Sequence, residues 1–395
     1  MIREQRPRSS LSNQGGDTTT WGDPTAAEAL ADALDAVDAP ADELTHGFHT
    51  YPARMHPVIA ARVLHAFSRE NDRVLDPFCG SGTVLVEAMV AGCQAIGVDL
   101  NPLALRIAEA HVAHPDAAAR AKFLATLEQV GAASETRVRS RTKAIAPLSA
   151  KERAVYAPNV VLELAGLRHE ILSVEARTTR RMLEVVLSSL IVKVSLQRAD
   201  TSTELTEKRI RKGLTTELFV RKGRELVERW AALEHELPPH AQPAHLVLGD
   251  ARALPELVRG RFDIVLSSPP YGGTYDYHAH HALRYPWLGI DASALEQGEI
   301  GARRALSNAR DGAERWDEEL VHTLRATSSV LRDGGCIVLL IGDGDLGGKR
   351  VDAHQQLARL AKHANLRAVA GAAQVRTDFR GGPERREHLL MLSHA

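Results

Sequence analysis

The stretch Val74-Leu-Asp-Pro-Phe-Cys-Gly-Ser-Gly-Thr83 joins an apolar run to an acid, a glycine-rich turn and the start of a helix. Glycine allows the backbone to take positive φ angles and to approach a ligand closely. The free N–H groups at the start of a helix then face that ligand. The stretch therefore predicts a turn that cradles a nucleotide.

The segments after this turn continue an α/β alternation. Residues 94–99 are expected to form a strand that ends in Asp99, and Asn101-Pro102 are expected to cap and begin the next helix. Asp99 follows the glycines by about 20 residues, the spacing of a ribose-binding carboxylate. Its alternative role is that of a turn residue at a strand end.

Composition narrows the class of protein. The chain has 395 residues, of which 44% are hydrophobic and 25% charged, with a net charge of −1, as in ordinary soluble globular proteins. The three cysteines are scattered, and His46, His49 and His56 have no carboxylate or cysteine at ligand spacing, so we predict neither a disulfide framework nor a metal site. The absence of a signal-peptide pattern and of a long apolar run predicts a cytoplasmic protein without a membrane span.

The alternation stops near Pro115 and resumes at His245. We predict a disordered tail over residues 1–22, a cofactor half over 23–115, a helical insertion over 116–240 and a catalytic half over 241–395. The insertion is locally basic, and Arg198, Lys208, Arg211 and Lys212 are candidates for contacts with nucleic-acid phosphates. The alternative is a solvated helix face.

A second stretch, Ser268-Pro-Pro-Tyr271, indicates what the nucleotide cradle serves. The prolines form a rigid strand end with outward carbonyls. The Pro269 carbonyl and the Ser268 hydroxyl are suited to accept hydrogen bonds from an exocyclic amine, and the Tyr271 ring is suited to stack on an extruded base. The glycine turn has Leu85 where a dinucleotide fingerprint has its third glycine, which favours a methyl-donor site over NAD.

Together, Asp76-Pro-Phe-Cys-Gly-Ser-Gly-Thr83 and Ser268-Pro-Pro-Tyr271 resemble the motifs of the amino-methylating DNA methyltransferases, which modify N4 of cytosine or N6 of adenine. The resemblance covers residues 46–112 and 245–395. It implies a Rossmann-like class I methyltransferase sheet of about seven strands with the last one antiparallel, and S-adenosylmethionine as cofactor. The implied catalytic residues are Ser268, Pro269, Pro270 and Tyr271. The implied cofactor-binding residues are Tyr51, Arg54, Asp76, Pro77, Phe78, Gly80, Gly82, Thr83, Asp99, Leu100, Asp250 and Ala251.

The resemblance also gives these residues roles. Asp99 is expected to hold the ribose hydroxyls, Asp250 the adenine amino edge, and Arg54 the cofactor carboxylate. The insertion is expected to recognise the target, and Tyr275 and Tyr277 are expected to contact the substrate. Ser268 at the first position of the tetrapeptide favours cytosine N4 over adenine N6. DNA is the expected partner, together with a cognate restriction endonuclease, and the oligomeric state is not predicted.

Three other functions stay open at this point. An RNA guanine-N2 methyltransferase uses similar motifs, but usually carries an N-terminal RNA-binding domain, for which only about 45 residues precede the first loop. A catalytically silent nucleic-acid-binding module is disfavoured by the intact motifs. A protein glutamine methyltransferase usually lacks Pro-Phe-Cys in its glycine motif.

Overall fold

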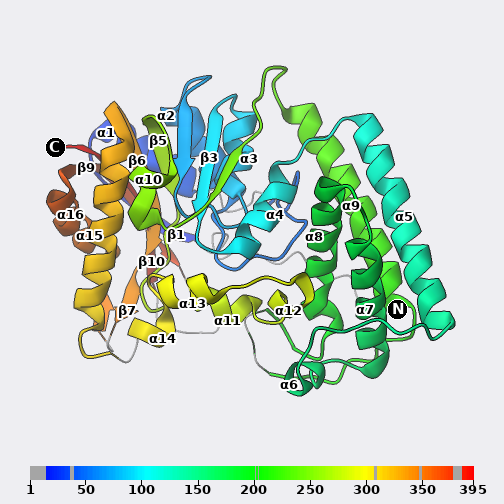
Figure 1. Cartoon of the computed structure of the whole chain (residues 1–395). Helices are drawn as coiled ribbons and strands as arrows, with labels where there is room; N and C mark the ends of the chain where they lie inside the picture. Colours follow the sequence, from blue (N-terminus) through cyan, green and yellow to red (C-terminus); the bar gives the residue numbers. More distant parts are fainter. Residues whose placement is uncertain are drawn as a thin grey trace.

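The computed structural model describes residues 15–35, 40–200, 202, 204–306, 309–346, 349–376 and 385–395. These residues form an eight-stranded sheet and a separate two-stranded ribbon, flanked by helices (Figure 1). The strands are β1 (Gly15–Gly22), β2 (Arg73–Asp76), β3 (Gln94–Asp99), β4 (His245–Leu248), β5 (Phe262–Ser267), β6 (Leu331–Gly342), β7 (Gly344–Leu346), β8 (Lys349–Val351), β9 (Leu366–Arg376) and β10 (Arg385–His394).

The sheet has the order β1-β9-β10-β6-β5-β2-β3-β4. Strands β4, β3, β2, β5 and β6 run parallel, and β10 is antiparallel to both β6 and β9. A parallel block followed by one reversed strand is the Rossmann-like class I methyltransferase sheet that the sequence predicted. The carboxyl ends of the parallel strands meet at one edge, where ligands bind in open α/β sheets.

Strand β1 corrects the prediction of a disordered tail over residues 1–22. Residues 15–22 pair antiparallel with β9 and give the sheet one strand more than expected, whereas residues 1–14 lie outside the described part of the chain. The Trp21 ring lies against Gly371 and stacks on His354 with ring centroids 4.1 Å apart. Ser, Thr and Gly dominate the sequence in and around this edge strand, and such a composition is typical of a disordered tail.

The two faces of the sheet are covered by different helices. Along β2, Val74 packs with α1, α2 and α3, whereas Leu75 packs with α10, α15 and α16 on the other face. This alternation follows from the two-residue period of a strand. The helices that cover the faces are α1 (Pro24–Leu34), α2 (Pro57–Phe67), α3 (Thr83–Val90), α10 (Leu254–Leu257), α15 (Gly312–Val330) and α16 (Ala353–Ala361).

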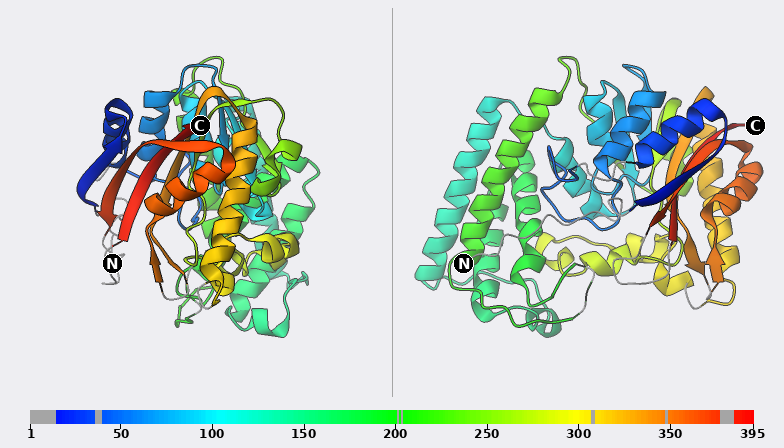
Figure 2. Two further views of the ribbon diagram at one scale, coloured as in Figure 1. Left: turned by 90° about the vertical axis from the view of Figure 1, so that its left-hand side faces the viewer. Right: turned by 180° about the vertical axis from the view of Figure 1, so that it is seen from behind.

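A second layer of helices stands beside the β4 side of the sheet, away from β1 (Figure 2). It consists of α5 (Ala117–Arg139), α6 (Ala150–Arg153), α7 (Pro158–Leu172), α8 (Arg177–Val194) and α9 (Leu214–Glu236). Helix α4 (Pro102–Val112) joins the two parts, because Leu105 packs toward the sheet and Ile107 toward the helical layer. None of the helices in the described ranges has the length and apolarity that crossing a membrane requires.

Residues 272–306, which we call the strap, leave the sheet directly after Tyr271. The strap carries α11 (Tyr277–His281), α12 (Tyr285–Leu288), α13 (Ser293–Gly298) and α14 (Arg303–Leu306). It runs below the carboxyl edge of the sheet to the helical layer (Figure 1). There the indole N–H of Trp287 donates to the Tyr156 hydroxyl (3.2 Å), and Arg168 donates to the Trp287 carbonyl (2.9 Å).

Candidate active site

The glycine turn after β2 adopts the geometry that its sequence predicted. Gly80 has a φ of +50° and Gly82 a φ of +86°, and Gly82 is the N-cap residue of α3. A Cβ atom on Gly80 would lie 3.0 Å from the Tyr51 ring, and one on Gly82 would lie 3.1 Å from the Ala108 Cβ. Both positions therefore require glycine, for backbone conformation and for close packing.

Two acids flank the turn, Asp76 buried and Asp99 half-buried. Asp99 accepts hydrogen bonds from the N–H groups of Gly80 and Asn101, both at 2.8 Å. Asp76 accepts from the Ser267 hydroxyl (2.5 Å) and the Phe78 N–H (3.1 Å). Burial raises the pKa of Asp76 to about 7 and that of Asp99 to about 6, although these hydrogen bonds act in the opposite direction.

The third predicted acid, Asp250, has a cationic partner. Its carboxylate accepts from the Arg252 guanidinium at 2.6–3.1 Å, and from the Arg252 N–H at 2.8 Å as the cap of a short 3₁₀ turn. Burial raises its pKa, but the hydrogen bonds from Arg252 outweigh burial and leave the pKa below its ordinary value. Asp250 therefore stays ionised where Asp76 and Asp99 become protonated.

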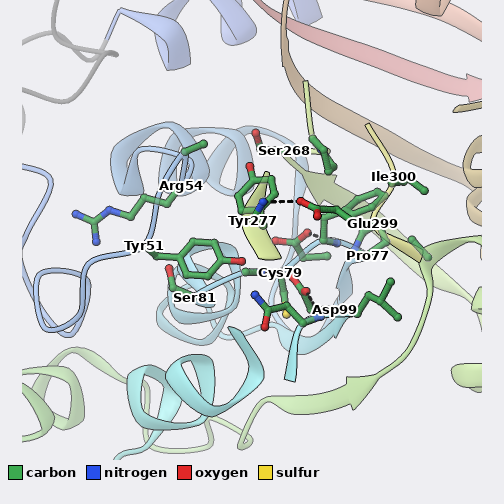
Figure 3. Close-up of a pocket in the computed structure, with 18 of the residues that line it drawn as sticks. Tyr51, Arg54, Pro77, Cys79, Ser81, Asp99, Ser268, Tyr277, Glu299 and Ile300 are labelled. Carbon is green, nitrogen blue, oxygen red and sulfur yellow. Dashed lines mark hydrogen bonds between the residues drawn. The ribbon is translucent and has the colours of Figure 1, made fainter. Parts of the chain in front are cut away.

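One cleft brings the two sequence motifs together at the carboxyl edge of the sheet (Figure 3). It encloses about 840 Å³ of space when open solvent is included. The predicted residues that line it are Tyr51, Arg54, Asp76, Pro77, Phe78, Gly80, Thr83, Asp99, Leu100, Asp250, Ala251, Ser268, Pro270 and Tyr277. Cys79, which was not predicted as a site residue, lines it as well. Residues almost 190 positions apart in the chain thus share one site.

Other predicted residues lie outside the lining of this cleft. Gly82, Pro269, Tyr271 and Tyr275 are not among the lining residues. The Tyr271 hydroxyl donates to Glu387 (2.8 Å), and its ring packs against Gly342 at the end of β6. In this structure the ring therefore buttresses the end of the sheet, and its expected role in stacking on a base stays a prediction.

The loop before α2 combines pocket residues with structural ones. Tyr51 faces the cleft, but the Arg54 guanidinium points away from it (Figure 3) and donates to the carbonyl oxygens of Ala41 and His46. Two of its N–H groups thus bond to the backbone, and the expected contact between Arg54 and the cofactor carboxylate stays a prediction.

The histidines of this loop have structural partners. His46 Nε2 contacts Glu87 (2.6 Å), His49 Nε2 contacts the Ser188 hydroxyl (2.9 Å), and His56 caps α2 by accepting from the Val58 N–H (3.2 Å). Within the described ranges, one group has metal-binding atoms close together, namely Asp343, Asp352 and His388. Both Asp343 oxygens there accept from N–H donors, as expected of a structural acid.

The basic residues predicted to contact DNA are partly engaged within the helical layer. The Lys208 ammonium donates to the carbonyls of Gln197 (2.6 Å) and Val192 (3.4 Å). Arg198 pairs with Glu204 (2.9 Å), and Arg211 pairs with Glu217. The two arginine side chains remain more than half exposed, so they are accessible from solvent, whereas Lys208 stabilises the loop locally.

Several buried polar atoms at the cleft have no hydrogen-bond partner among the described residues. They are Ser81 Oγ, Thr83 Oγ1 and Asn101 Nδ2, and all three residues line the cleft. Buried polar groups are normally satisfied, so these atoms indicate a polar ligand. With the carboxyl groups of Asp76 and Asp99 and the apolar side chains of Leu100 and Ile300, the lining fits a cofactor with amino, carboxylate, hydroxyl and aromatic parts.

The strap supplies lining residues that the sequence did not indicate. These are Leu295, Gly298, Glu299 and Ile300. They belong to no motif and lie about 30 residues after Ser268, so only the return of the strap to the sheet brings them to the cleft. An acid followed by an apolar residue, as at Glu299-Ile300, is too weak a sequence signal to predict residues of a binding site.

Comparisons with known proteins agree with the motifs. Residues 14–110 match a DNA methylase family model, N6_N4_Mtase. The chain is 41% identical over 71 residues to the type II methyltransferase M.MvaI of Kocuria varians, covering 17% of this chain and 16% of that protein. It is 24% identical over 262 residues to the type II methyltransferase M.BsoBI of Geobacillus stearothermophilus, covering 58% of this chain and 49% of that protein.

A shorter match involves an RNA enzyme. The tRNA (guanine(10)-N2)-dimethyltransferase of Methanothermobacter thermautotrophicus is 38% identical over 52 residues, covering 13% of this chain and 16% of that protein. The matched parts span half or less of the length of all three relatives.

Proposed function

The family model and the type II relatives support an amino-methylating DNA methyltransferase family for this chain, and on that basis we propose that it transfers a methyl group to an exocyclic amine of a base in DNA. One observation carries the proposal. Asp76 of the glycine motif and Asp99 at the end of β3 line the same cleft as Ser268 and Pro270 of the second motif. A donor and an acceptor amine can therefore meet in a single site.

When bound, S-adenosylmethionine supplies a methyl group on a sulfonium cation. We propose that Asp99 and Asn101 hold the ribose, that Ser81, Thr83 and Asp76 hold the methionyl part, and that Leu100, Ala251 and Asp250 hold the adenine. These assignments rest on the side chains that face the cleft and on their unsatisfied polar atoms.

The acceptor side of the cleft orients the amine and does not activate it chemically. The Ser268 hydroxyl and the carbonyls of the Pro269-Pro270 strand end accept hydrogen bonds from the amine and aim its nitrogen at the methyl group. Holding the two reactants in the correct orientation removes much of the activation barrier to such a transfer. The bound sulfonium would supply the methyl group to the nitrogen that these acceptors hold, and the amine would release its proton to water. Ser268 favours cytosine N4 as the acceptor, with adenine N6 as the alternative.

Residues 116–240 are proposed to recognise the target. The exposed guanidinium groups of Arg198 and Arg211, together with Lys212, would contact phosphates on the DNA that enters beside the strap. A cognate restriction endonuclease is a further prediction, since M.MvaI and M.BsoBI are type II methyltransferases.

The test supplies labelled S-adenosylmethionine with duplex DNA, single-stranded DNA or tRNA, followed by identification of the methylated nucleoside. We expect N4-methylcytosine from duplex DNA. Ser268→Ala should lower the methylation rate, and Arg359→Gln, on the far surface of α16, should not. If the product were N6-methyladenine instead, methyl transfer to DNA would still hold, and the acceptor would be adenine N6 rather than cytosine N4.

The second candidate is an RNA guanine-N2 methyltransferase, which the partial similarity to a tRNA dimethyltransferase favours. Label in tRNA alone would establish this alternative and contradict methylation of DNA. Absence of cofactor binding in calorimetry would contradict both enzyme functions and leave a nucleic-acid-binding module.

A further inference from the structure

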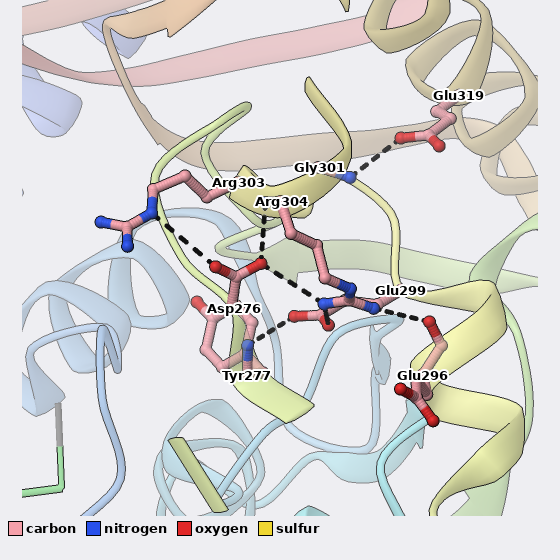
Figure 4. A network of polar contacts seen from close by, with 8 residues as sticks. All are labelled: Asp276, Tyr277, Glu296, Glu299, Gly301, Arg303, Arg304 and Glu319. Carbon is pink, nitrogen blue, oxygen red and sulfur yellow. Dashed lines mark hydrogen bonds and ion pairs between the residues drawn. The ribbon is translucent and has the colours of Figure 1, made fainter. Parts of the chain in front are cut away.

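The first and last residues of the strap lie side by side and are hydrogen-bonded to each other (Figure 4). The Gly273 N–H donates to the Gly301 carbonyl, and the Arg303 N–H donates to the Tyr275 carbonyl, each at 3.0 Å. The Gly301 N–H donates in turn to Glu319 of α15 (2.9 Å). The two ends of the strap are therefore tied together beside the cleft and fixed to a helix of the sheet.

Three side chains, Asp276, Glu299 and Arg304, reinforce this junction, and we call them the clasp. The Glu299 carboxylate accepts from the Tyr277 N–H and from the Arg304 guanidinium, both at 2.5 Å. Arg304 also donates to the Asp276 carboxylate (3.3 Å) and to the Glu296 carbonyl (2.6 Å). A single guanidinium thus connects both ends of the strap (Figure 4).

The clasp provides a hydrogen-bond acceptor for a backbone N–H at the start of α11. The Tyr277 N–H lies in the first turn of that helix, where backbone donors lack partners within the helix. Asp276 occupies the N-cap position but makes no capping hydrogen bond with its side chain, because its carboxylate is held by Arg304. Glu299, from the other end of the strap, satisfies the Tyr277 N–H instead.

Glu299 is also part of the cleft. Its side chain is only 3% exposed, and it lines the cleft together with Ser268 and Tyr277. The Tyr277 ring lies over the cleft beside Tyr51, with ring centroids 6.2 Å apart and planes inclined by 21°. Any displacement of the Tyr277 backbone therefore moves the wall that faces both the donor and Ser268.

We propose that Glu299 is a positioning residue for methyl transfer: held by Arg304, it fixes the Tyr277 backbone and so sets the wall of the cleft against which the acceptor base lies. This inference rests on the proposed function. Arg304 supplies a cationic partner at 2.5 Å for this buried carboxylate and holds it against the Tyr277 N–H. Because Glu299 acts through Tyr277, its loss should disturb alignment more than it weakens cofactor binding.

Misplacement of reacting groups by about 1 Å costs on the order of a hundredfold in rate. We therefore expect Glu299→Ala to lower kcat for DNA methylation by roughly ten- to a hundredfold, while the Kd of S-adenosylmethionine changes less than about threefold. Glu299→Gln should recover part of kcat, because an amide oxygen can still accept from the Tyr277 N–H. Arg304→Gln should resemble Glu299→Ala, and the double variant Glu299→Ala/Arg304→Gln should be no worse than either.

The matched control is Arg303→Gln, which changes the neighbouring arginine of α14: its side chain is 66% exposed, and its ion pair with Asp276 is longer (3.7 Å) than that of Arg304 (3.3 Å). Arg303→Gln should keep kcat within about twofold of the unchanged protein. Equal losses of kcat in Arg303→Gln and Arg304→Gln would overturn the proposal, as would additive losses in the double variant. If Glu299→Ala does not fold, Glu299→Gln and Arg304→Gln carry the same comparison.

Different results would contradict the role of Glu299 and the proposed function. If the unchanged protein methylates DNA but Glu299→Ala keeps its kcat within about threefold, the role of Glu299 is wrong and the proposed function stands. If the unchanged protein binds S-adenosylmethionine and transfers no methyl group to DNA, the proposed function is wrong, and with it the role assigned to Glu299.

Discussion

Asp76 and Asp99 place two carboxyl groups with raised pKa values, about 7 and about 6, beside the cleft. Near pH 5.5 both are largely protonated, and by pH 7.5 both are largely ionised. Since S-adenosylmethionine carries a sulfonium cation, the ionised acids attract it and the protonated acids do not. Cofactor affinity should therefore rise with pH.

We expect this rise to be roughly tenfold between pH 5.5 and pH 7.5, since one pKa unit corresponds to about 1.4 kcal/mol. Titration calorimetry at several pH values measures it. Asp76→Asn should flatten the dependence. Asp250→Asn should weaken binding at every pH without changing the slope, because the pKa of Asp250 is lowered by Arg252 and its charge is constant over this range. A slope that survives Asp76→Asn and Asp99→Asn would contradict the assignment.

The same shifts affect the protein without cofactor. Between about pH 4 and pH 7 the folded chain keeps protons on Asp76 and Asp99 that the unfolded chain has released. The free energy of unfolding contributed by these groups therefore falls as the pH rises through this window. Added cofactor should offset that loss above pH 7, since it favours the ionised carboxylates.

At this scale the sequence predicted residues whose role depends on a local motif, and it missed those whose role depends on the path of the chain. The positive φ of Gly80 and Gly82 and the strand-end position of Asp99 follow from the motif itself. The direction of the Arg54 side chain does not, because the carbonyls of Ala41 and His46 that hold it come from an irregular loop. Glu299 reaches the cleft through the return of the strap.

Among the elements, β1 is an edge strand whose contacts with the rest of the sheet can be tested by mutation. It pairs with β9, and the Trp21 ring covers Gly371, where an added Cβ would overlap the ring. Gly371→Ala should lower the free energy of unfolding by about 1–3 kcal/mol, the usual cost of overpacking. Denaturant unfolding measures the change.

Gly16→Ala on the same strand pair is the control. Its Cβ would meet the Val375 Cβ at 3.6 Å, an ordinary contact, so the free energy of unfolding should stay within about 0.5 kcal/mol. If the two variants were equally stable, the Trp21–Gly371 contact would not hold β1 in place.

The elements that the sequence predicted well are those with a strong pattern. The buried parallel strands β2, β3 and β5 are short apolar runs that end in an acid or a serine, and α4 begins with a clear Asn-Pro cap. Strand β1 has no apolar run of its own. Its stability comes from pairing with β9, more than 340 residues away in sequence, and local patterns do not record such pairing.

At the scale of the whole molecule, the strap joins the helical layer to the cleft through a buried arginine. The Arg284 side chain is 1% exposed, forms an ion pair with Asp200 and donates to the Ser188 carbonyl (3.3 Å). Its neighbour His281 lies against Tyr51, with ring centroids 5.1 Å apart, and Tyr51 lines the cleft. A continuous series of contacts therefore runs from the loop after α8 to the cofactor site.

Removing one partner of a buried ion pair leaves the other charge without compensation, which costs about 3–5 kcal/mol. We therefore expect Asp200→Asn and Arg284→Gln each to lower the free energy of unfolding by about that amount, measured by denaturant unfolding with tryptophan fluorescence as the signal. Because both variants break the same pair, the loss in the double variant should be much smaller than the sum of the two single losses.

The exposed pair Arg198–Glu204 on the same loop provides the comparison, since its side chains are 66% and 58% exposed. Arg198→Gln should change the free energy of unfolding by less than about 1 kcal/mol, as is usual for surface ion pairs. If Arg284→Gln proved equally mild, the hydrogen bonds and the apolar packing around Trp287 would hold the helical layer to the strap without this ion pair. Contact with DNA on the layer would then not act on the cleft through the Arg284–Asp200 pair.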